Sequence, residues 1–135
     1  MSSTKTNANE IKKERRKKLF LQEFAVLIQE LSIQEPLVAQ VYVTSVDLSA
    51  DTGICHFYFA TFKEPGEEIF AAALEVLKLY RPSLRKAFVE RINMRYGPDL
   101  MFAYDKGKEK ERRINSLLDK VSEQLAESND RDHKA

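Results

Sequence analysis

The side chains best suited to chemistry in this sequence are its one cysteine and two histidines. Cys55 and His56 are adjacent in a segment rich in aromatic and β-branched residues, so on a strand their side chains would point to opposite faces. The other histidine, His133, lies in the polar C-terminal tail. These three residues cannot complete a structural zinc site without carboxylates. We therefore expect neither a metal nor a cofactor.

Catalytic motifs give no stronger signal. Ser49, His56 and Asp47 could formally supply a Ser–His–Asp triad, but no nucleophile elbow frames the serine. The chain also lacks a Walker-type phosphate loop and a dinucleotide fingerprint. The aromatic run Phe57–Phe59 could be compared with a base-stacking platform, but alternation along a strand buries at least half of it. We expect a protein that is not an enzyme, with these aromatic rings in its core.

Positive charge is concentrated in two segments, although the net charge of the chain is only +1. Residues 12–18 (KKERRKK) carry a net charge of +5, residues 78–95 also carry +5, and the remainder therefore carries −9. Such asymmetry can steer a polyanion to one face. A solvated helix start, or arginine stems that cover the core edge, would give the same pattern. The candidate phosphate contacts are Arg81, Arg85, Lys86, Arg91 and Arg95, with Lys12, Lys13, Arg15, Arg16, Lys17 and Lys18 as a second patch.

Length and composition predict one domain with a substantial core, since 43% of the 135 residues are hydrophobic. The N-terminal sequence MSSTKTNANE lacks the apolar region of a secretory signal, and no apolar run approaches the length of a membrane span. A single cysteine allows no intramolecular disulfide. We expect a cytoplasmic protein that does not enter a membrane, and a monomer.

Hydrophobic periodicity predicts the order of elements. A helix over about residues 10–32 is followed by strands over 37–49 and 54–62, joined by the turn ADTG as an antiparallel hairpin. Helical stripes over 70–77 and 84–92, a strand over 96–105 and a helix over 114–125 complete the order. The first helix should bury one stripe, composed of Phe20, Phe24, Leu27, Ile28 and Leu31. The predicted fold class is α+β, with the helices packed on one face of a small sheet.

Pro82 interrupts the helical pattern between the fourth and fifth of these elements. A proline inside a helix costs about 3 kcal/mol, so we predict two helices that meet at a kink formed by Tyr80, Arg81 and Pro82. Pro82 would open the second helix, with Arg81 extended before it. The free N–H groups there could seat a phosphate. Positive charge near the start of a helix opposes the helix dipole and lowers stability, both after Pro82 and in residues 12–18. Binding of a polyanion would explain why the sequence tolerates this loss of stability.

Four stretches of the sequence resemble the bacterial ribosome-binding factor A family over residues 10–125. The hairpin VYVTSVDLSADTGICHFYF is similar to the family pattern Val-x-Val-Thr-x-Val-x-Leu-Ser-x-Asp. FAVLIQELS resembles the end of its first helix, LRKAFVERINMRYGPDLMFAYD its Arg-rich segment and third strand, and ERRINSLLDKV its closing helix. The family's Ala-x-Gly kink aligns with residues 80–82, where proline would enforce the bend that glycine permits.

The resemblance implies a type II KH-like fold: helix, strand, strand, helix, kink, helix and strand, plus a C-terminal helix. The domain would occupy residues 10–126, between a flexible N-terminus (1–9) and a disordered tail (127–135). It implies an assembly factor that binds the 30S ribosomal subunit and its 16S rRNA, near the 5′-terminal helix and the decoding region. Such a factor assists late maturation and 5′-end processing of 16S rRNA. The alternative is a non-catalytic protein–protein interaction domain that does not touch RNA directly.

Overall fold

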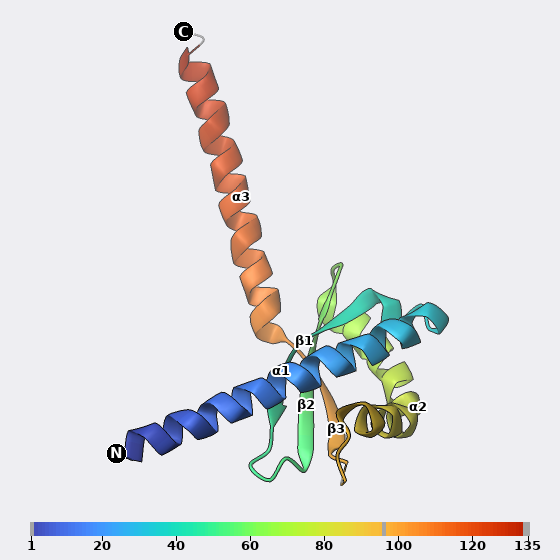
Figure 1. Ribbon diagram of the computed structural model, residues 1–135. Coiled ribbons are helices and arrows are strands. Elements are labelled where there is room, and N and C mark those ends of the chain that lie inside the picture. Colours follow the sequence, from blue (N-terminus) through green and yellow to red (C-terminus); the bar gives the residue numbers. More distant parts are fainter. Residues whose placement is uncertain (1, 96, 134–135) are drawn as a thin grey trace. The chain divides into compact units, whose positions relative to one another are not determined.

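The computed structural model describes the backbone of residues 2–95 and 97–133, and the side chains of residues 8–95 and 97–126. The chain divides into two units, before and after residue 105. The first unit contains, in order, α1 (Ser2–Gln34), the 3₁₀ turn η1 (Val38–Gln40), β1 (Val41–Leu48), β2 (Ile54–Thr61), α2 (Gly66–Ile92) and β3 (Asp99–Tyr104) (Figure 1). The second contains α3 (Lys106–His133). The predicted α+β class is confirmed.

The helices at the two ends of the chain are longer than the sequence pattern predicted. α1 begins at Ser2 rather than near residue 10, and α3 spans 106–133 rather than 114–125. Periodicity marks only the part of a helix that has an apolar stripe. Nothing in the polar extensions stops a helix, because residues 2–34 contain no glycine or proline and α3 contains glycine only in its first turn. α1 ends two residues before Pro36, as expected.

The predicted hairpin is confirmed, and β1 pairs antiparallel with β2. β1 starts at Val41 rather than at residue 37, because residues 37–40 turn back and both Val38 and Ala39 donate backbone hydrogen bonds to the carbonyl of Glu35. In the turn between the strands, the Asp51 carboxylate accepts hydrogen bonds from the Gly53 N–H (2.9 Å) and the Ser49 hydroxyl (2.8 Å). These bonds favour the charged carboxylate and lower its pKa.

The sheet has the order β1–β2–β3, with β2 and β3 parallel. Parallel neighbours need a crossover, and α2 provides it. Alternate residues of β2 are fully buried: Cys55, Phe57 and Phe59 face the helices, while His56 and Tyr58 are only partly buried on the other face. The prediction that alternation sends half of the aromatic run into the core is therefore correct.

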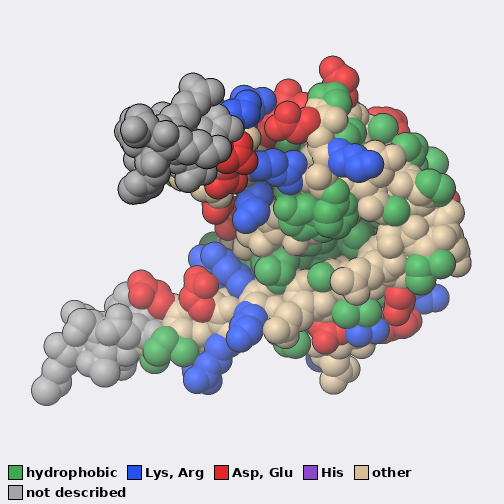
Figure 2. Space-filling model, turned by 90° about the horizontal axis from the view of Figure 1, so that it is seen from above, with side chains coloured by type: hydrophobic (Ala, Val, Ile, Leu, Met, Phe, Trp, Pro, Cys, Tyr) green, Lys and Arg blue, Asp and Glu red, His purple; other side chains and the backbone are tan. Residues whose placement is uncertain are grey.

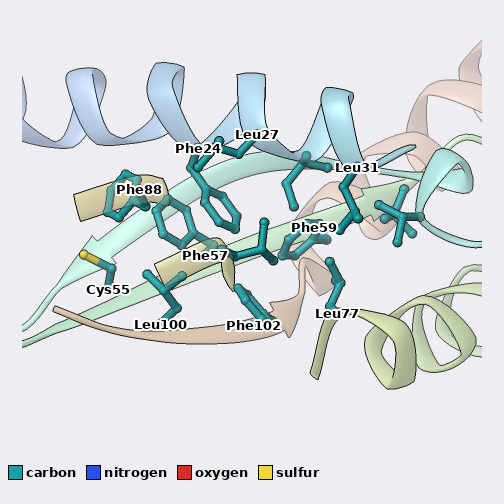
Figure 3. Packing of buried hydrophobic residues seen from close by; sticks show 14 of the residues in the cluster. Phe24, Leu27, Leu31, Cys55, Phe57, Phe59, Leu77, Phe88, Leu100 and Phe102 are labelled. Carbon is teal, nitrogen blue, oxygen red and sulfur yellow. The ribbon is translucent and has the colours of Figure 1, made fainter. Parts of the chain in front are cut away.

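The core lies between one face of the sheet and the helices α1 and α2. Figure 3 shows Phe24 of α1 pointing at the strands, where its ring stacks on Phe57 at a centroid distance of 3.9 Å. Phe88 of α2 meets Phe24 edge-on at 5.9 Å, and Phe102 of β3 lies at the same distance. The predicted stripe of α1 is buried along its whole length, at Phe20, Phe24, Leu27, Ile28 and Leu31.

The prediction that Pro82 opens a second helix is wrong, because residues 66–92 form one helix with Pro82 inside it; the chain nevertheless bends in this region (Figure 1). Arg81 is helical rather than extended, and no second helix N-terminus is available to seat a phosphate. Leu77 and Leu84, on either side of the proline, are both buried in the core, so packing holds the two halves together. Pro82 itself is exposed and removes one intrahelical hydrogen bond. Figure 1 shows α2 changing direction where its ribbon passes from yellow-green to olive.

The ring of Phe24, at the centre of the core, should contribute strongly to the free energy of unfolding. We expect Phe24→Ala to lower the free energy of unfolding by about 3–5 kcal/mol, since the fully buried ring contacts four other phenylalanines and its removal leaves a cavity. Leu19→Ala, on the exposed side of the same helix, should change it by less than about 0.5 kcal/mol. Urea unfolding followed by circular dichroism measures both. Equal effects would show that the core is not where the structure puts it.

Cys55 should be inert in the folded protein. Burial raises the pKa of its thiol from 9.0 to about 12, because the apolar surroundings disfavour the thiolate. The folded state keeps a proton that the unfolded state releases above pH 9.0, so this group's contribution to stability falls as the pH rises from there towards about 12. At about pH 8 we expect no reaction with a disulfide reagent until guanidinium chloride is added. Rapid reaction of the native protein would contradict this.

Candidate nucleic-acid interface

The first basic segment, residues 12–18, lies on α1 just before the helix reaches the core at Phe20. We call this segment the α1 arm. Two of its cations anchor it to the hairpin: Arg16 Nη1 donates to Thr52 Oγ1 at 3.0 Å, and Lys17 Nζ lies 3.9 Å from Asp47 Oδ1. Figure 2 shows Lys and Arg side chains on more than one side of this part of α1, at the lower left.

The other four cations of the α1 arm are exposed and pair with none of the residues that the structure describes; they are Lys12, Lys13, Arg15 and Lys18. The sequence predicted that the arm opens a helix. It does not, because α1 begins at Ser2. The dipole argument for this segment is therefore wrong, since that effect falls off within the first turn. A cost remains, because like charges three and four residues apart repel one another on a helix surface.

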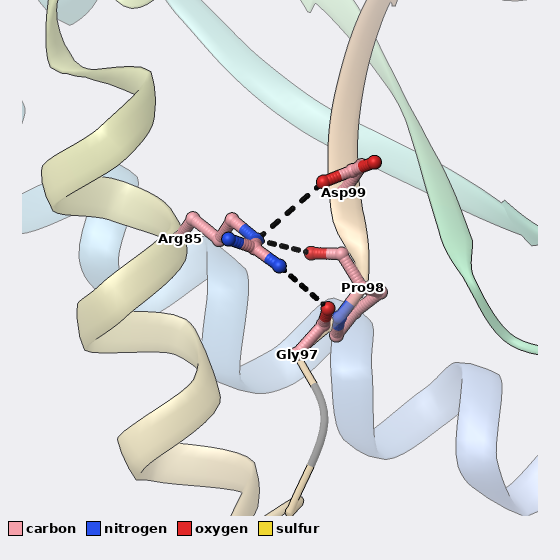
Figure 4. Close-up of polar contacts among 4 residues, drawn as sticks. All are labelled: Arg85, Gly97, Pro98 and Asp99. Atoms are coloured by element: carbon pink, nitrogen blue, oxygen red, sulfur yellow. Dashed lines mark hydrogen bonds and ion pairs between the residues drawn. The ribbon is translucent and has the colours of Figure 1, made fainter.

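Arg85 of α2 holds the loop that leads into β3 (Figure 4). Its Nη2 donates to the Gly97 carbonyl at 2.9 Å and its Nε to the Pro98 carbonyl at 3.1 Å, while Asp99 Oδ1 lies 3.6 Å from Nε. The planar guanidinium suits this task because it offers several donors in a fixed geometry. Arg85 is thus engaged in the fold, and it lies in the middle of α2 rather than at a helix N-terminus.

Two further arginines of α2 also join elements of the fold. Arg91 Nε donates to Glu23 Oε2 of α1 at 2.7 Å. Arg81 lies over the ring of Phe102, 5.2 Å from its centroid, in a cation–π contact. Its Nε is buried, and no group in the described part of the chain accepts a hydrogen bond from it. The sequence left open whether the α2 arginines bind phosphate or cover the edge of the core. The contacts of Arg81 and Arg91 fit the second interpretation.

Lys86, next to Arg85, is exposed and has no partner among the described residues. Arg95, beyond the end of α2, is exposed as well. The two basic segments border the same turn between β1 and β2. Arg16 binds Thr52 of this turn, and the adjacent Gly53 carbonyl accepts a hydrogen bond from the N–H of Asp99, which Arg85 holds. Arg16 and Arg85, one from each basic segment, thus lie at the same end of the sheet.

Tyr80, predicted to be part of a kink, ties α2 to the segment after α1. Its hydroxyl donates to Glu35 Oε1 at 2.6 Å, and this bond to a carboxylate raises the pKa of the phenol. Sequence reasoning did not find this contact or the acceptors of Arg85 and Arg91. The partners lie between 12 and 68 residues away along the chain, and no local pattern links them.

The residues considered for catalysis have structural contacts. Asp47 and His56 are cross-strand partners, but the Ser49 hydroxyl donates to Asp51 and accepts from the N–H of Ile54 at 2.9 Å, so it serves the turn. Among the described residues, no three His, Cys, Asp or Glu side chains form a group that could hold a metal ion. No helix in the described part of the chain is long and apolar enough to cross a membrane.

Comparison with known proteins gives a consistent result. The family model for ribosome-binding factor A matches residues 12–118, so the match ends within α3. Ribosome-binding factor A of Chromohalobacter salexigens is 36% identical over 100 residues, which cover 74% of this chain and 76% of the relative.

Two solved structures are also similar. The crystal structure of ribosome-binding factor A from Thermus thermophilus matches with a TM-score of 0.57 at 25% identity, covering 67% of this chain and 92% of that one. A homology model of the Thermus thermophilus factor, fitted into the cryo-electron microscopy map of its complex with 30S, matches with a TM-score of 0.52 at 26% identity, covering 64% and 88%. From the extent of the family match and this identity to a relative, the chain belongs to the ribosome-binding factor A family.

Proposed function

We propose that this protein is a ribosome assembly factor that binds the 30S subunit through its 16S rRNA. It assists late maturation of the subunit, including processing of the 5′ end of 16S rRNA, and performs no catalysis itself. Its place of action is the cytoplasm, where subunits are assembled. Family membership supports this, as does the complex of the Thermus thermophilus factor with 30S.

The observation that carries the proposal is the set of four exposed cations on the α1 arm that pair with none of the described residues. Long, exposed lysine and arginine side chains on neighbouring helical turns repel one another, and rRNA phosphates would relieve this repulsion. Because the cations point to more than one side of the helix, the α1 arm suits a groove between RNA strands better than a flat surface. Contacts to the backbone position the protein by the shape of the RNA and not by its base sequence.

The α2 cations extend this interface on the other side of the β1–β2 turn. Lys86 is exposed and pairs with none of the described residues, whereas Arg81, Arg85 and Arg91 are committed to contacts within the fold. We therefore place the main electrostatic contribution on the α1 arm and a smaller one on α2. The 5′-terminal helix and the decoding region of 16S rRNA are the proposed contact regions.

Removal of the four unpaired arm cations should weaken subunit binding and its salt dependence. The variant carries Lys12→Gln, Lys13→Gln, Arg15→Gln and Lys18→Gln. If each cation contacts one phosphate, the slope of log affinity against log salt should fall by about 3, and affinity at about 0.1 M salt should drop at least about tenfold. Co-sedimentation with purified 30S subunits at several salt concentrations measures both. The matched control changes the same number of exposed cations outside the two basic segments: Lys63, Lys106, Lys110 and Lys120, each to glutamine.

The same two variants test the role in maturation. In cells that lack the native protein, we expect 16S rRNA with an unprocessed 5′ end to accumulate, and the control variant to correct this. The arm variant should correct it poorly. If the arm variant binds 30S with unchanged affinity and slope, the arm does not contact phosphate. The alternative, a protein–protein interaction domain that binds the subunit without RNA contact, would then be favoured.

Arg85 and Lys86 are neighbours on α2, and we expect the first to act in stability and the second in subunit binding. Arg85→Ala removes hydrogen bonds to two carbonyls and should lower the free energy of unfolding by about 1–2 kcal/mol, allowing for the partial exposure of the side chain. Lys86→Ala should change stability by less than about 0.5 kcal/mol and lower the salt slope of 30S binding by about 1. Urea unfolding and co-sedimentation distinguish them. The reverse pattern would assign the phosphate contact to Arg85.

A further inference from the structure

α3 presents a stripe of large apolar side chains that is not buried. Each is between 48% and 62% exposed, and the set is Ile114, Leu117, Leu118, Val121 and Leu125. Four of these five follow the alternating spacing of four and three residues that is typical of a coiled-coil seam. A helix in water gains most of its stability from packing of its apolar face. Within the unit that α3 forms, no described side chain covers this stripe on an otherwise polar helix.

The charges of α3 are segregated along its length. Residues 106–113 carry a net charge of +3 and residues 119–133 carry −3. This polarity is the opposite of what the helix dipole favours, since the N-terminal end of a helix attracts negative charge and the C-terminal end attracts positive charge. The distribution therefore disfavours an isolated helix. It favours a helix that lies beside a partner of opposite polarity.

We propose that α3 pairs in an antiparallel fashion with α3 of a second copy of this chain. A two-fold axis beside residues 119 and 120 would place Ile114 against Leu125 of the second copy, and Leu118 against its Val121. The basic stretch 106–113 of each copy would then lie beside the acidic end of the other. The interface is self-complementary in both its apolar seam and its charge, as a two-fold dimer requires.

Other occupants fit this surface less well. A parallel pair would bring the two basic stretches together, and the two acidic stretches together. An RNA partner would be attracted by residues 106–113 but repelled by 119–133, and it would leave the apolar stripe in water. The charge pattern of α3 matches an inverted copy of itself. A second copy of the chain would therefore cover the apolar stripe and also pair the opposite charges.

The proposal goes beyond ribosome binding and departs from the monomer expected from the sequence. The family match ends at residue 118, so the second half of the seam, including Val121 and Leu125, lies outside it. Five apolar residues per copy make a small interface, so the dimer should be transient, with a dissociation constant of about 1–100 μM.

Sedimentation equilibrium of the full chain over that concentration range tests the proposal. The native protein should show a reversible monomer–dimer equilibrium that weakens at high salt. Leu118→Asp places a carboxylate at the centre of the seam and should raise the dissociation constant at least about tenfold. Ser116→Asp adds the same charge to the opposite face of α3, and that variant should dimerise like the native protein. A monomer at every concentration, or a dimer that Leu118→Asp leaves intact, would overturn the proposal.

Disulfide trapping tests the orientation. In an antiparallel pair, a mixture of Ile114→Cys and Leu125→Cys chains should form the mixed disulfide in preference to either homodimer. Each variant alone should cross-link poorly. The native Cys55 does not interfere because it is fully buried and burial raises its pKa to about 12. Efficient cross-linking of each variant with itself would indicate a parallel pair and contradict the charge argument.

Discussion

The stack of Phe24 on Phe57 is the contact on which the rest of the structure depends. It joins α1 to the central strand, and Phe88 and Phe102 add α2 and β3 to the same cluster. Aromatic rings bury a large apolar area and also favour particular geometries, so a cluster of four fixes how the elements face one another. The positions of the surface cations follow from it, because α1 enters the core at Phe20 and leaves residues 12–18 outside.

The cations divide into two groups with different physical roles. Arg81, Arg85 and Arg91 interact with a ring, with carbonyls and with a carboxylate, and these contacts suit a planar, multidentate group. The unpaired cations of the α1 arm are mostly lysines, which are flexible point charges and suit phosphates whose positions vary. A net charge near zero thus conceals a protein with two distinct sets of cations, one engaged in the fold and one exposed on the α1 arm.

The sequence predicted the order of the elements, the hairpin and the buried stripe of α1, because each depends on local periodicity or turn chemistry. It did not predict that α2 continues through Pro82, since packing of Leu77 and Leu84 decides this. The candidate site was predicted as a set of positive residues. Which of them are free was not predictable, because the partners of Arg85 and Arg91 come from distant segments that only the tertiary fold brings close.

The parallel pairing of β2 with β3 affects how the chain acquires its structure during synthesis. The strands are separated by the whole of α2, so β3 leaves the ribosome long after the hairpin is complete. Until then the outer edge of β2 has no neighbouring strand, although β2 is the most buried strand of the finished sheet. The nascent chain therefore passes through a stage that is prone to aggregation, and fast docking of α2 would shorten it.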